Sequence, residues 1–374
     1  MKGSFVIGKI KGILIEVNIS WFVIFALVTY SLASGYLPVY YPDFDTATRW
    51  ILGGIISLLF FISVLLHELS HSLISTGLGI PVKNITLFIF GGVAQIEKEP
   101  DEPGKELKIA IAGPAMSLLL SVLFLLLSKT SVYLGAPEPA AAAFTYLSDI
   151  NLTLALFNLF PAFPLDGGRI LRAVIWHFSK NLQKATRISS AMGELFGYSL
   201  IAIGVFLLLN NNIINGLWLL FIGWFINQMS KQSYQSMLIS DIFKNIQVSK
   251  FMTDKVVTVD YNISVQELIE DYFYKYKFAI FPVKQNDEIV GIVLADSIKQ
   301  LQKESRLSTS VGEITTSLTD NLVVSADDTV TAAMTKLSAN GIGRVIVMDH
   351  GNLLGIVSNT DILNYISLYS KLNT

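Results

Sequence analysis

The chain has 374 residues, of which 52% are hydrophobic and only 15% are charged, and its mean hydropathy is +0.54. Soluble domains carry about 25% charged residues, so this composition is typical of an integral membrane protein. A net charge of −2 gives no sign of a nucleic-acid partner, and the lack of cysteine excludes disulfides and thiolate metal sites. Any metal must therefore be bound by His, Asp, Glu or backbone groups.

Five or six apolar stretches are long enough to cross a bilayer, which takes about 20 residues. They are residues 19–37, 50–78, 107–127, 140–160, 191–209 and 213–229. The fourth stretch is the weakest, because it contains Asp149, Asn151 and Asn158. We expect a polytopic α-helical membrane domain over residues 1–230, followed by a more polar second half.

The basic residues between these stretches predict the orientation, because cytoplasmic loops carry an excess of Lys and Arg. One side holds only Arg49 and Lys129, and the other holds Lys2, Lys9, Lys11, Lys83, Lys98, Lys105, Lys108, Arg169, Arg172, Lys180, Lys184 and Arg187. This bias predicts a multi-pass protein of the cell membrane with both termini in the cytoplasm. The second span then runs inward, which places His67 about 26 Å along its helix from Trp50, near the cytoplasmic end.

Two short segments have the pattern of strands rather than helices. Residues 1–17 alternate like a strand pair. Residues 84–100 contain the β-branched and aromatic run "ITLFIF", the breaker Gly91-Gly92 and the alternating "VAQIE". This second pattern predicts a hairpin or re-entrant strand at the membrane surface, with a simple interfacial loop as the alternative.

The second span contains His67, Glu68 and His71, which form an H-E-x-x-H motif. Residues four apart share one helix face, so both imidazoles can bind one ion. Zinc suits two neutral histidines, and Glu68 can accept a proton from the metal-bound water. The alternative is a pair of core histidines hydrogen-bonded across helices, which would leave Glu68 without a partner in hydrocarbon.

A catalytic zinc needs a further protein ligand, and Asp166 in "NLFPAFPLDGGRILR" is the best candidate. It follows the fourth span, which also runs inward, so it reaches the same membrane face as the histidines. The rivals are His177 and Glu194, and the alternative role for Asp166 is that of a helix N-cap. Asn158, at the start of the segment, is either a structural hydrogen-bonder or a substrate-binding or oxyanion-stabilising amide.

The second half follows a linker at residues 231–246 and contains an internal repeat with a period of about 65 residues. Residues 257–298 match residues 323–363. The two copies extend over about 247–305 and 306–374, and each has the pattern strand, helix, strand, polar turn, strand, helix. We expect the copies to pack together as one soluble α/β module.

The first half resembles the site-2 protease family of intramembrane zinc metalloproteases. The resemblance rests on "HELSH" followed by N-x-x-P-x-x-P-L-D-G-G-R, with "FGGVAQ" and "AGPAMS" as further similar segments. It implies a Zn²⁺ ion held by His67, His71 and Asp166, with Glu68 as general base and Asn158 contacting substrate.

The resemblance also implies regulated intramembrane proteolysis, in which a peptide bond within or near a transmembrane segment is cleaved. The substrate is then a membrane protein, met within membrane lipid, whose unwound segment pairs with the strand at Gly91, Gly92 and Val93. The chain departs from many family members at Ser117, where they carry Asn. It also has no PDZ-like insertion, so substrate selection must differ from that of members that have one.

The second half resembles a tandem pair of CBS domains, which commonly bind adenine nucleotides such as ATP, ADP or AMP. In the second copy "GIVSNTD" supplies Gly355, Ser358 and Asp361, and the last two match the family's phosphate- and ribose-contacting positions. The first copy has Leu294 and Ser297 at those two positions, so we expect at most one competent site. The alternative is a structural module or one that forms a homodimer.

Two other functions compete with a membrane zinc endopeptidase regulated by this module. A CBS-regulated transporter would need polar residues on several spans, and the H-E-x-x-H motif would be a coincidence. An inactive membrane scaffold predicts loss of the metal-binding or base residues, and none is lost here.

Overall fold

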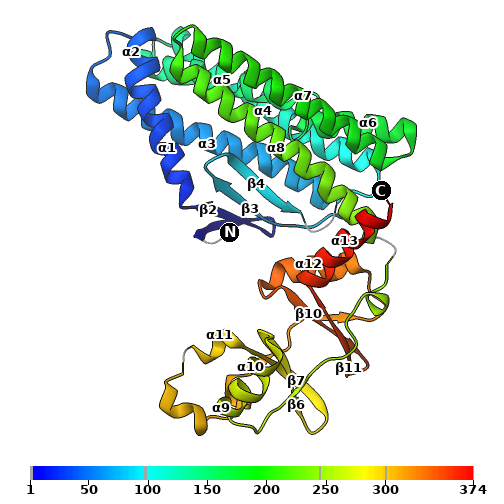
Figure 1. Cartoon of the computed structure of the whole chain (residues 1–374). Helices are drawn as coiled ribbons and strands as arrows, with labels where there is room; N and C mark the ends of the chain where they lie inside the picture. The colour runs from blue at the N-terminus through cyan, green and yellow to red at the C-terminus, as the bar shows by residue number, and fades with distance from the viewer. Residues whose placement is uncertain (1–2, 97–98, 244–245, 300, 374) are drawn as a thin grey trace. The chain divides into compact units, whose positions relative to one another are not determined.

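The computed structural model describes all residues except 1–2, 97–98, 244–245, 300 and 374. Lys2 and Lys98, which were counted in the charge bias, therefore lie outside the described residues. The chain divides into two compact units, Met1–Gln235 and Ser236–Thr374, and each is described by itself (Figure 1).

Among the residues that the structure describes, six helices are long and apolar enough to cross a membrane, which confirms the predicted polytopic helical domain. The first crossing is continuous through α1 (Ser20–Ser31), η1 (Leu32–Tyr36) and α2 (Leu37–Tyr40). The others are α3 (Thr46–Gly77), α4 (Pro103–Tyr133), α5 (Glu138–Asn158), α7 (Leu182–Leu209) and α8 (Ile213–Phe243). Several helices extend beyond the apolar stretches. Their polar end residues still form the backbone hydrogen bonds of the helix, which do not depend on hydropathy.

One shorter helix, α6 (Asp166–Ser179), separates α5 from α7 and packs against both α4 and α7. Pro161 and Pro164 lie in the non-helical segment just before it, whereas Gly167 and Gly168 already belong to its first turn. The helix begins at Asp166, and its N-cap residue is Leu165, without a side-chain cap. The alternative role of Asp166 as an N-cap is therefore wrong, because the helix starts one residue earlier than that role requires.

Both predicted β segments are present and join in one four-stranded sheet. Its strands are β1 (Ser4–Ile10), β2 (Ile13–Asn18), β3 (Val82–Phe88) and β4 (Gly91–Ile96), in that spatial order. The two hairpins are antiparallel, and β2 pairs with β3 in parallel. Apolar residues on one face, including Ile13, Val82 and Ile85, pack against Leu69 of α3. Strand β4 is one edge of this sheet, so one row of its backbone groups has no strand partner among the residues that the structure describes.

The second unit contains two copies of the predicted α/β repeat. The first has β5 (Val259–Asp260), α9 (Val265–Glu267), η3 (Leu268–Phe273), α10 (Tyr274–Tyr276), β6 (Ile280–Gln285), β7 (Glu288–Leu294), α11 (Ala295–Ile298) and β8 (Thr316–Ser317). The second has β9 (Val323–Ser325), α12 (Val330–Asn340), β10 (Arg344–Asp349), β11 (Asn352–Ser358) and α13 (Asn359–Asn373). Short helical turns η2 (Val248–Lys250), η4 (Lys303–Leu307) and η5 (Val311–Ile314) precede or connect the copies.

The residues expected to form a linker are largely helical. Helix α8 continues through them to Phe243, and Ile239 and Ile242 on its last turns pack against the core of the second repeat. Phe243 is itself fully buried in that core. Residues 244–245 of the expected linker lie outside the described part of the chain.

Candidate functional site

His67 and His71 lie one turn apart on α3, and both are buried. Their Nε2 atoms are 3.3 Å from each other. The Nδ1 atom of His67 is 2.8 Å from the Ser117 hydroxyl, and Nδ1 of His71 donates to the backbone carbonyl of Ile109 at 2.6 Å. These contacts on the far ring nitrogens fix the ring orientations and direct both Nε2 atoms to one point.

Asp166 completes a triangle of ligand atoms at this point. Its Oδ2 atom is 3.2 Å from Nε2 of His67 and 3.2 Å from Nε2 of His71. Tetrahedral zinc with bonds of about 2.0–2.1 Å separates its ligand atoms by about 3.3 Å. These three residues can therefore hold a metal ion of that size.

The charge state of Asp166 suits a metal ligand. Burial would raise the pKa of this carboxyl, but hydrogen bonds with the two histidines outweigh burial and hold the pKa below its usual range. The two rival ligands lie elsewhere: His177 is exposed at the far end of α6, and Glu194 is in α7.

The segment before Asp166 is held by close backbone contacts. A Cβ atom on Gly167 or Gly168 would overlap the backbone of residues 159–163, so only glycine allows this approach. The Phe163 backbone N–H donates to the Ser189 carbonyl at 3.3 Å, and the Ser230 hydroxyl donates to the Phe163 carbonyl at 2.6 Å. The glycine pair that follows Asp166 thus serves packing, and helices α7 and α8 fix the loop.

Gly113 of α4 lies directly against the two histidines. A Cβ atom there would overlap Nε2 of both His67 and His71. Sequence reasoning did not give this glycine a role, although it lies in the "AGPAMS" segment that carried part of the family resemblance. Helix α4 therefore reaches the triangle of candidate ligand atoms only because this position has no side chain.

Glu68 lies against the edge strand β4. Its side chain is half-buried and makes no hydrogen bond with any residue that the structure describes. A Cβ atom on Gly92 would overlap its Cγ atom, so the start of β4 touches this side chain. Gly91, Gly92 and the exposed Val93 are the first three residues of β4. An unpaired strand edge and an unpartnered carboxylate therefore meet next to the histidines.

Asn158 is the last residue of α5, eight positions before Asp166. Its side chain is half-buried, and within the described chain its amide has no hydrogen-bond partner. The interpretation of Asn158 as a structural hydrogen-bonder therefore has no contact to support it.

Sequence reasoning missed a buried ion pair that joins α6 to α4. Glu106 is fully buried, and its Oε1 atom accepts from Nε of Arg172 at 2.6 Å and also contacts Nη2. Arg172 was counted above as a loop cation, but it lies within α6 and is 6% exposed. No local pattern marks this pair, because its partners are 66 positions apart.

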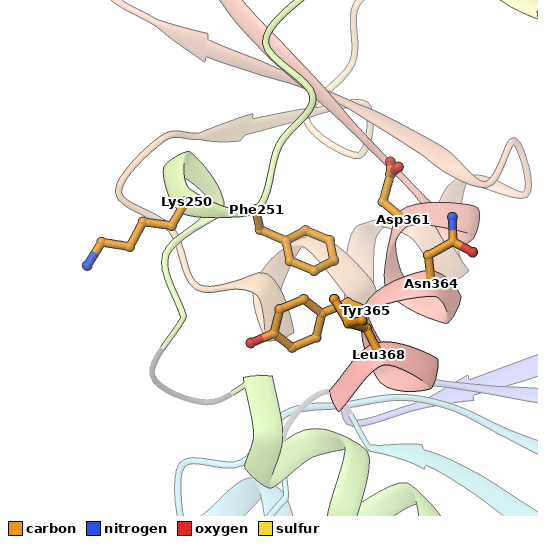
Figure 2. Close-up of a pocket in the computed structure, with 6 residues that line it drawn as sticks. All are labelled: Lys250, Phe251, Asp361, Asn364, Tyr365 and Leu368. Atoms are coloured by element: carbon orange, nitrogen blue, oxygen red, sulfur yellow. The ribbon is translucent and has the colours of Figure 1, made fainter. Parts of the chain in front are cut away.

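A cavity of about 290 Å³ lies in the second unit, lined by Lys250, Phe251, Asp361, Asn364, Tyr365 and Leu368 (Figure 2). Of the three predicted ligand residues, Asp361 lines it directly. The Ser358 backbone N–H and hydroxyl both donate to Oδ2 of Asp361, at 2.8 and 2.6 Å, so Ser358 orients this carboxylate. Gly355 packs instead against Met252 and the Thr253 carbonyl.

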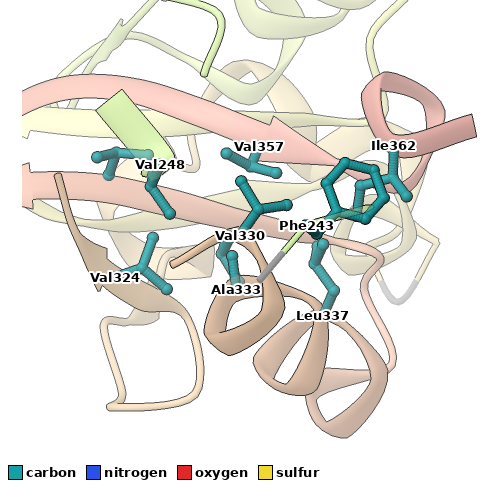
Figure 3. Close-up of a cluster of buried hydrophobic side chains, with 10 residues drawn as sticks. Phe243, Val248, Val324, Val330, Ala333, Leu337, Val357 and Ile362 are labelled. Carbon is teal, nitrogen blue, oxygen red and sulfur yellow. The ribbon is translucent and has the colours of Figure 1, made fainter. Parts of the chain in front are cut away.

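Aromatic rings connect this cavity to the core beneath it. The rings of Phe251 and Tyr365 are 5.4 Å apart, and each lies within 5.5 Å of the Phe243 ring, measured between centroids. Figure 3 shows Phe243 beside Ile362 in the buried cluster that also contains Val248, Val324, Val330, Ala333, Leu337, Val345, Val347 and Val357. The cavity floor is therefore part of a fixed apolar core.

Comparisons with known proteins agree with both halves of this description. The model of peptidase family M50 matches residues 55–136 and 134–200, and the CBS domain model matches residues 248–304 and 311–368. The sll0528 protein of Synechocystis sp. is 33% identical over 97% of this chain and 95% of its own length. Zinc metalloprotease MJ0392 of Methanocaldococcus jannaschii is 32% identical over 96% of this chain and 95% of its own.

Among solved structures, a site-2 protease from Methanocaldococcus jannaschii is 31% identical, with a TM-score of 0.42. It matches 62% of this chain and 95% of that structure. The alignments with the two relatives above extend over nearly the whole chain, so they include both the membrane helices and the CBS repeats. The chain is therefore an integral membrane zinc metalloprotease that belongs to peptidase family M50, the site-2 protease family, and carries a tandem pair of CBS domains.

Proposed function

We propose that the chain cleaves a peptide bond within or near a transmembrane segment of a membrane protein, in regulated intramembrane proteolysis. His67, His71 and Asp166 would hold the zinc ion. The observation that carries the proposal is their triangle of ligand atoms, 3.2–3.3 Å on each side, formed by α3, a helix of membrane-spanning length, and by α6.

The chain supplies the other groups that hydrolysis needs. Bound zinc would polarise the substrate carbonyl and lower the pKa of a water molecule to about 7. The carboxylate of Glu68 would take a proton from the attacking water and pass it to the leaving nitrogen. The unpartnered amide of Asn158 would donate to the substrate.

The edge of β4 would hold the unwound substrate. A transmembrane helix shields its peptide bonds with its own hydrogen bonds, so cleavage requires local unwinding. Gly91, Gly92 and Val93 begin the unpaired edge, and an extended segment can add to it as a further strand. Because Gly92 touches Glu68, a strand added there would bring its backbone close to the base.

Metal analysis and cleavage of a transmembrane substrate test these roles together, with the full-length protein in a lipid bilayer. The Glu68→Gln variant should keep about one zinc per chain and lose cleavage by roughly 10²–10⁴-fold, because an amide cannot accept the proton. His71→Ala should lose zinc, and Asp166→Ala should weaken its binding. Near-normal cleavage by Glu68→Gln would reject the mechanism. Full zinc in Asp166→Ala, with zinc lost in His177→Ala, would reassign the third ligand.

We also propose that both termini and the CBS module are cytoplasmic in the cell membrane, and that an adenine nucleotide regulates cleavage. Phe251 and Tyr365 offer an apolar surface for the adenine ring of the nucleotide. Asp361 retains a second carboxylate oxygen that can accept hydrogen bonds from the ribose hydroxyls. The ligand regulates only if it binds the active and inactive arrangements unequally.

Titration of ATP, ADP and AMP against the full-length protein tests this regulation. We expect binding that weakens in Asp361→Asn, which keeps an oxygen for Ser358, and a parallel change in cleavage. If no nucleotide binds at millimolar concentration, or if binding leaves cleavage unchanged, the module is better explained as a homodimerisation element.

A further inference from the structure

A larger cavity, of about 650 Å³, lies in the membrane unit between the sheet and α6. One wall is formed by four consecutive residues of the edge strand β4, from Val93 to Ile96, and the other includes Arg169 and Arg172. This volume is in the range of about 300–1,000 Å³ found for ligand pockets. The cavity can therefore hold side chains of a peptide that lies along the edge.

The cavity begins at the proposed site of hydrolysis. Gly92 touches Glu68, and the next four residues of β4 line the cavity. At about 3.3 Å per residue, this wall extends roughly 3–13 Å from that contact. On the opposite wall, Arg169 follows Asp166 by three positions, which is about one turn of α6.

The wall on α6 presents two arginines to the cavity. Behind it, among the residues that the structure describes, the fully buried carboxylate of Glu106 already pairs with Arg172. Arg169 is 4.0 Å from the same carboxylate oxygen and donates no side-chain hydrogen bond to any described residue. Its side chain is 23% exposed, so a ligand can reach it. Glu99 also lines the cavity, but it is exposed to water, which screens its charge.

The walls are held in place before any ligand binds. On β3, Asn84 donates to the Thr86 hydroxyl at 3.1 Å, and this hydroxyl donates to Glu16 of β2 at 3.1 Å. On α6, the Arg172 guanidinium lies 5.1 Å from the Phe163 ring centroid. A preorganised cation next to an unpaired strand edge fits an acidic side chain on an extended peptide.

We propose that this cavity is a substrate subsite in which Arg169 pairs with an acidic side chain within about four residues of the cleaved bond. This inference rests on the proposed function, since the substrate must lie along β4. A glutamine in place of the acid would leave Arg169 without its ionic partner. A hydrogen bond between charged groups is strong enough for a preference of roughly tenfold or more in kcat/KM.

Matched transmembrane substrates test the subsite with the full-length enzyme. Each carries Glu or Gln at one of the four positions on either side of the cleaved bond. We expect at least one position at which the wild type prefers Glu over Gln by roughly tenfold and Arg169→Gln has a ratio near one. A third substrate with Lys at that position should be preferred over the Glu substrate by Arg169→Glu. Arg187→Gln, which removes an exposed arginine of α7 outside the cavity lining, should keep the wild-type ratio.

Binding of the same peptides to Glu68→Gln protein, with and without Arg169→Gln, separates failure of the subsite from failure of the proteolytic function. A Glu/Gln binding ratio that depends on Arg169 supports the subsite even if no cleavage occurs. A ratio near one at every position, or a preference that persists in Arg169→Gln, overturns it. An effect of Arg169→Gln that follows the fraction of anionic lipid, and not the Glu/Gln pair, would assign the cavity to a lipid headgroup and also overturn it.

Discussion

Replacing Gly113 with alanine tests whether the close approach of α4 builds the metal site. The added Cβ would overlap Nε2 of His71 and lie 2.5 Å from Nε2 of His67. Non-bonded heavy atoms need about 3.5 Å, so the His67 ring alone would have to move by about 1 Å. A zinc–nitrogen distance tolerates only about 0.2 Å. We therefore expect Gly113→Ala to lose zinc and, with it, cleavage.

The displaced His71 ring would also lose its hydrogen bond to the Ile109 carbonyl. Leaving such buried groups unsatisfied costs about 1–3 kcal/mol, which lowers the stability of the variant even without metal. Gly54→Ala in α3 is the matched control, because no atom lies within 4 Å of its new Cβ. That control should keep zinc and cleavage, and its stability should rise by up to about 1 kcal/mol through helix propensity.

Zinc per chain, cleavage of a transmembrane substrate and thermal unfolding are measured for both variants in the same lipid. We expect Gly113→Ala to contain at least tenfold less zinc than the wild type and to unfold near or below the temperature of chelator-treated wild type. If Gly113→Ala instead retained one zinc and normal cleavage, the histidines would not be pressed against α4, and the reasoning from this contact would be refuted.

Three further substitutions are predicted from single contacts. Gly92→Ala should displace Glu68 and lower kcat at least tenfold with zinc unchanged; an unchanged kcat would show that β4 does not touch the base. Arg172→Ala should cost roughly 3–5 kcal/mol in unfolding free energy, because it leaves buried Glu106 without its hydrogen-bond donor and with only the more distant Arg169 as a counter-charge, and Glu106→Gln in the same chain should recover part of that loss. Ser117→Ala should weaken zinc affinity by roughly 10–100-fold, measured by competition with a chelator; an unchanged affinity would show that the Ser117 hydroxyl does not orient the His67 imidazole.

The six membrane helices could be predicted because each span must be apolar over a fixed length and must satisfy its own backbone. The ends of the helices were less accessible to prediction. The apolar stretch at 107–127 is shorter than helix α4, which covers Pro103–Tyr133. At its start, Glu106 is buried through an ion pair with Arg172, which a hydropathy pattern does not register. Similarly, α8 extends beyond its apolar stretch because Phe243 is buried in the second unit.

The candidate site was predictable where its residues are close in sequence or are brought together by topology. His67 and His71 share a helix face by spacing alone, and Asp166 was reached through the direction of the spans. Contacts between distant segments left no local pattern. Ser117 was noticed only as a departure from the family, yet its hydroxyl lies 2.8 Å from His67.

Close contact with backbone explains how polar side chains remain ordered within an apolar helix. Isolated charged groups cost about 2.5–3.5 kcal/mol at the centre of a membrane helix, so each needs a partner. The His71 ring donates to the Ile109 carbonyl of α4, and Gly113, in the next turn, lets that backbone approach. A carbonyl acceptor does not titrate near neutral pH, unlike a carboxylate. The orientation of this imidazole therefore does not depend on the ionisation of the group that holds it, and its other nitrogen, which faces His67 and Asp166, stays available as a candidate metal ligand.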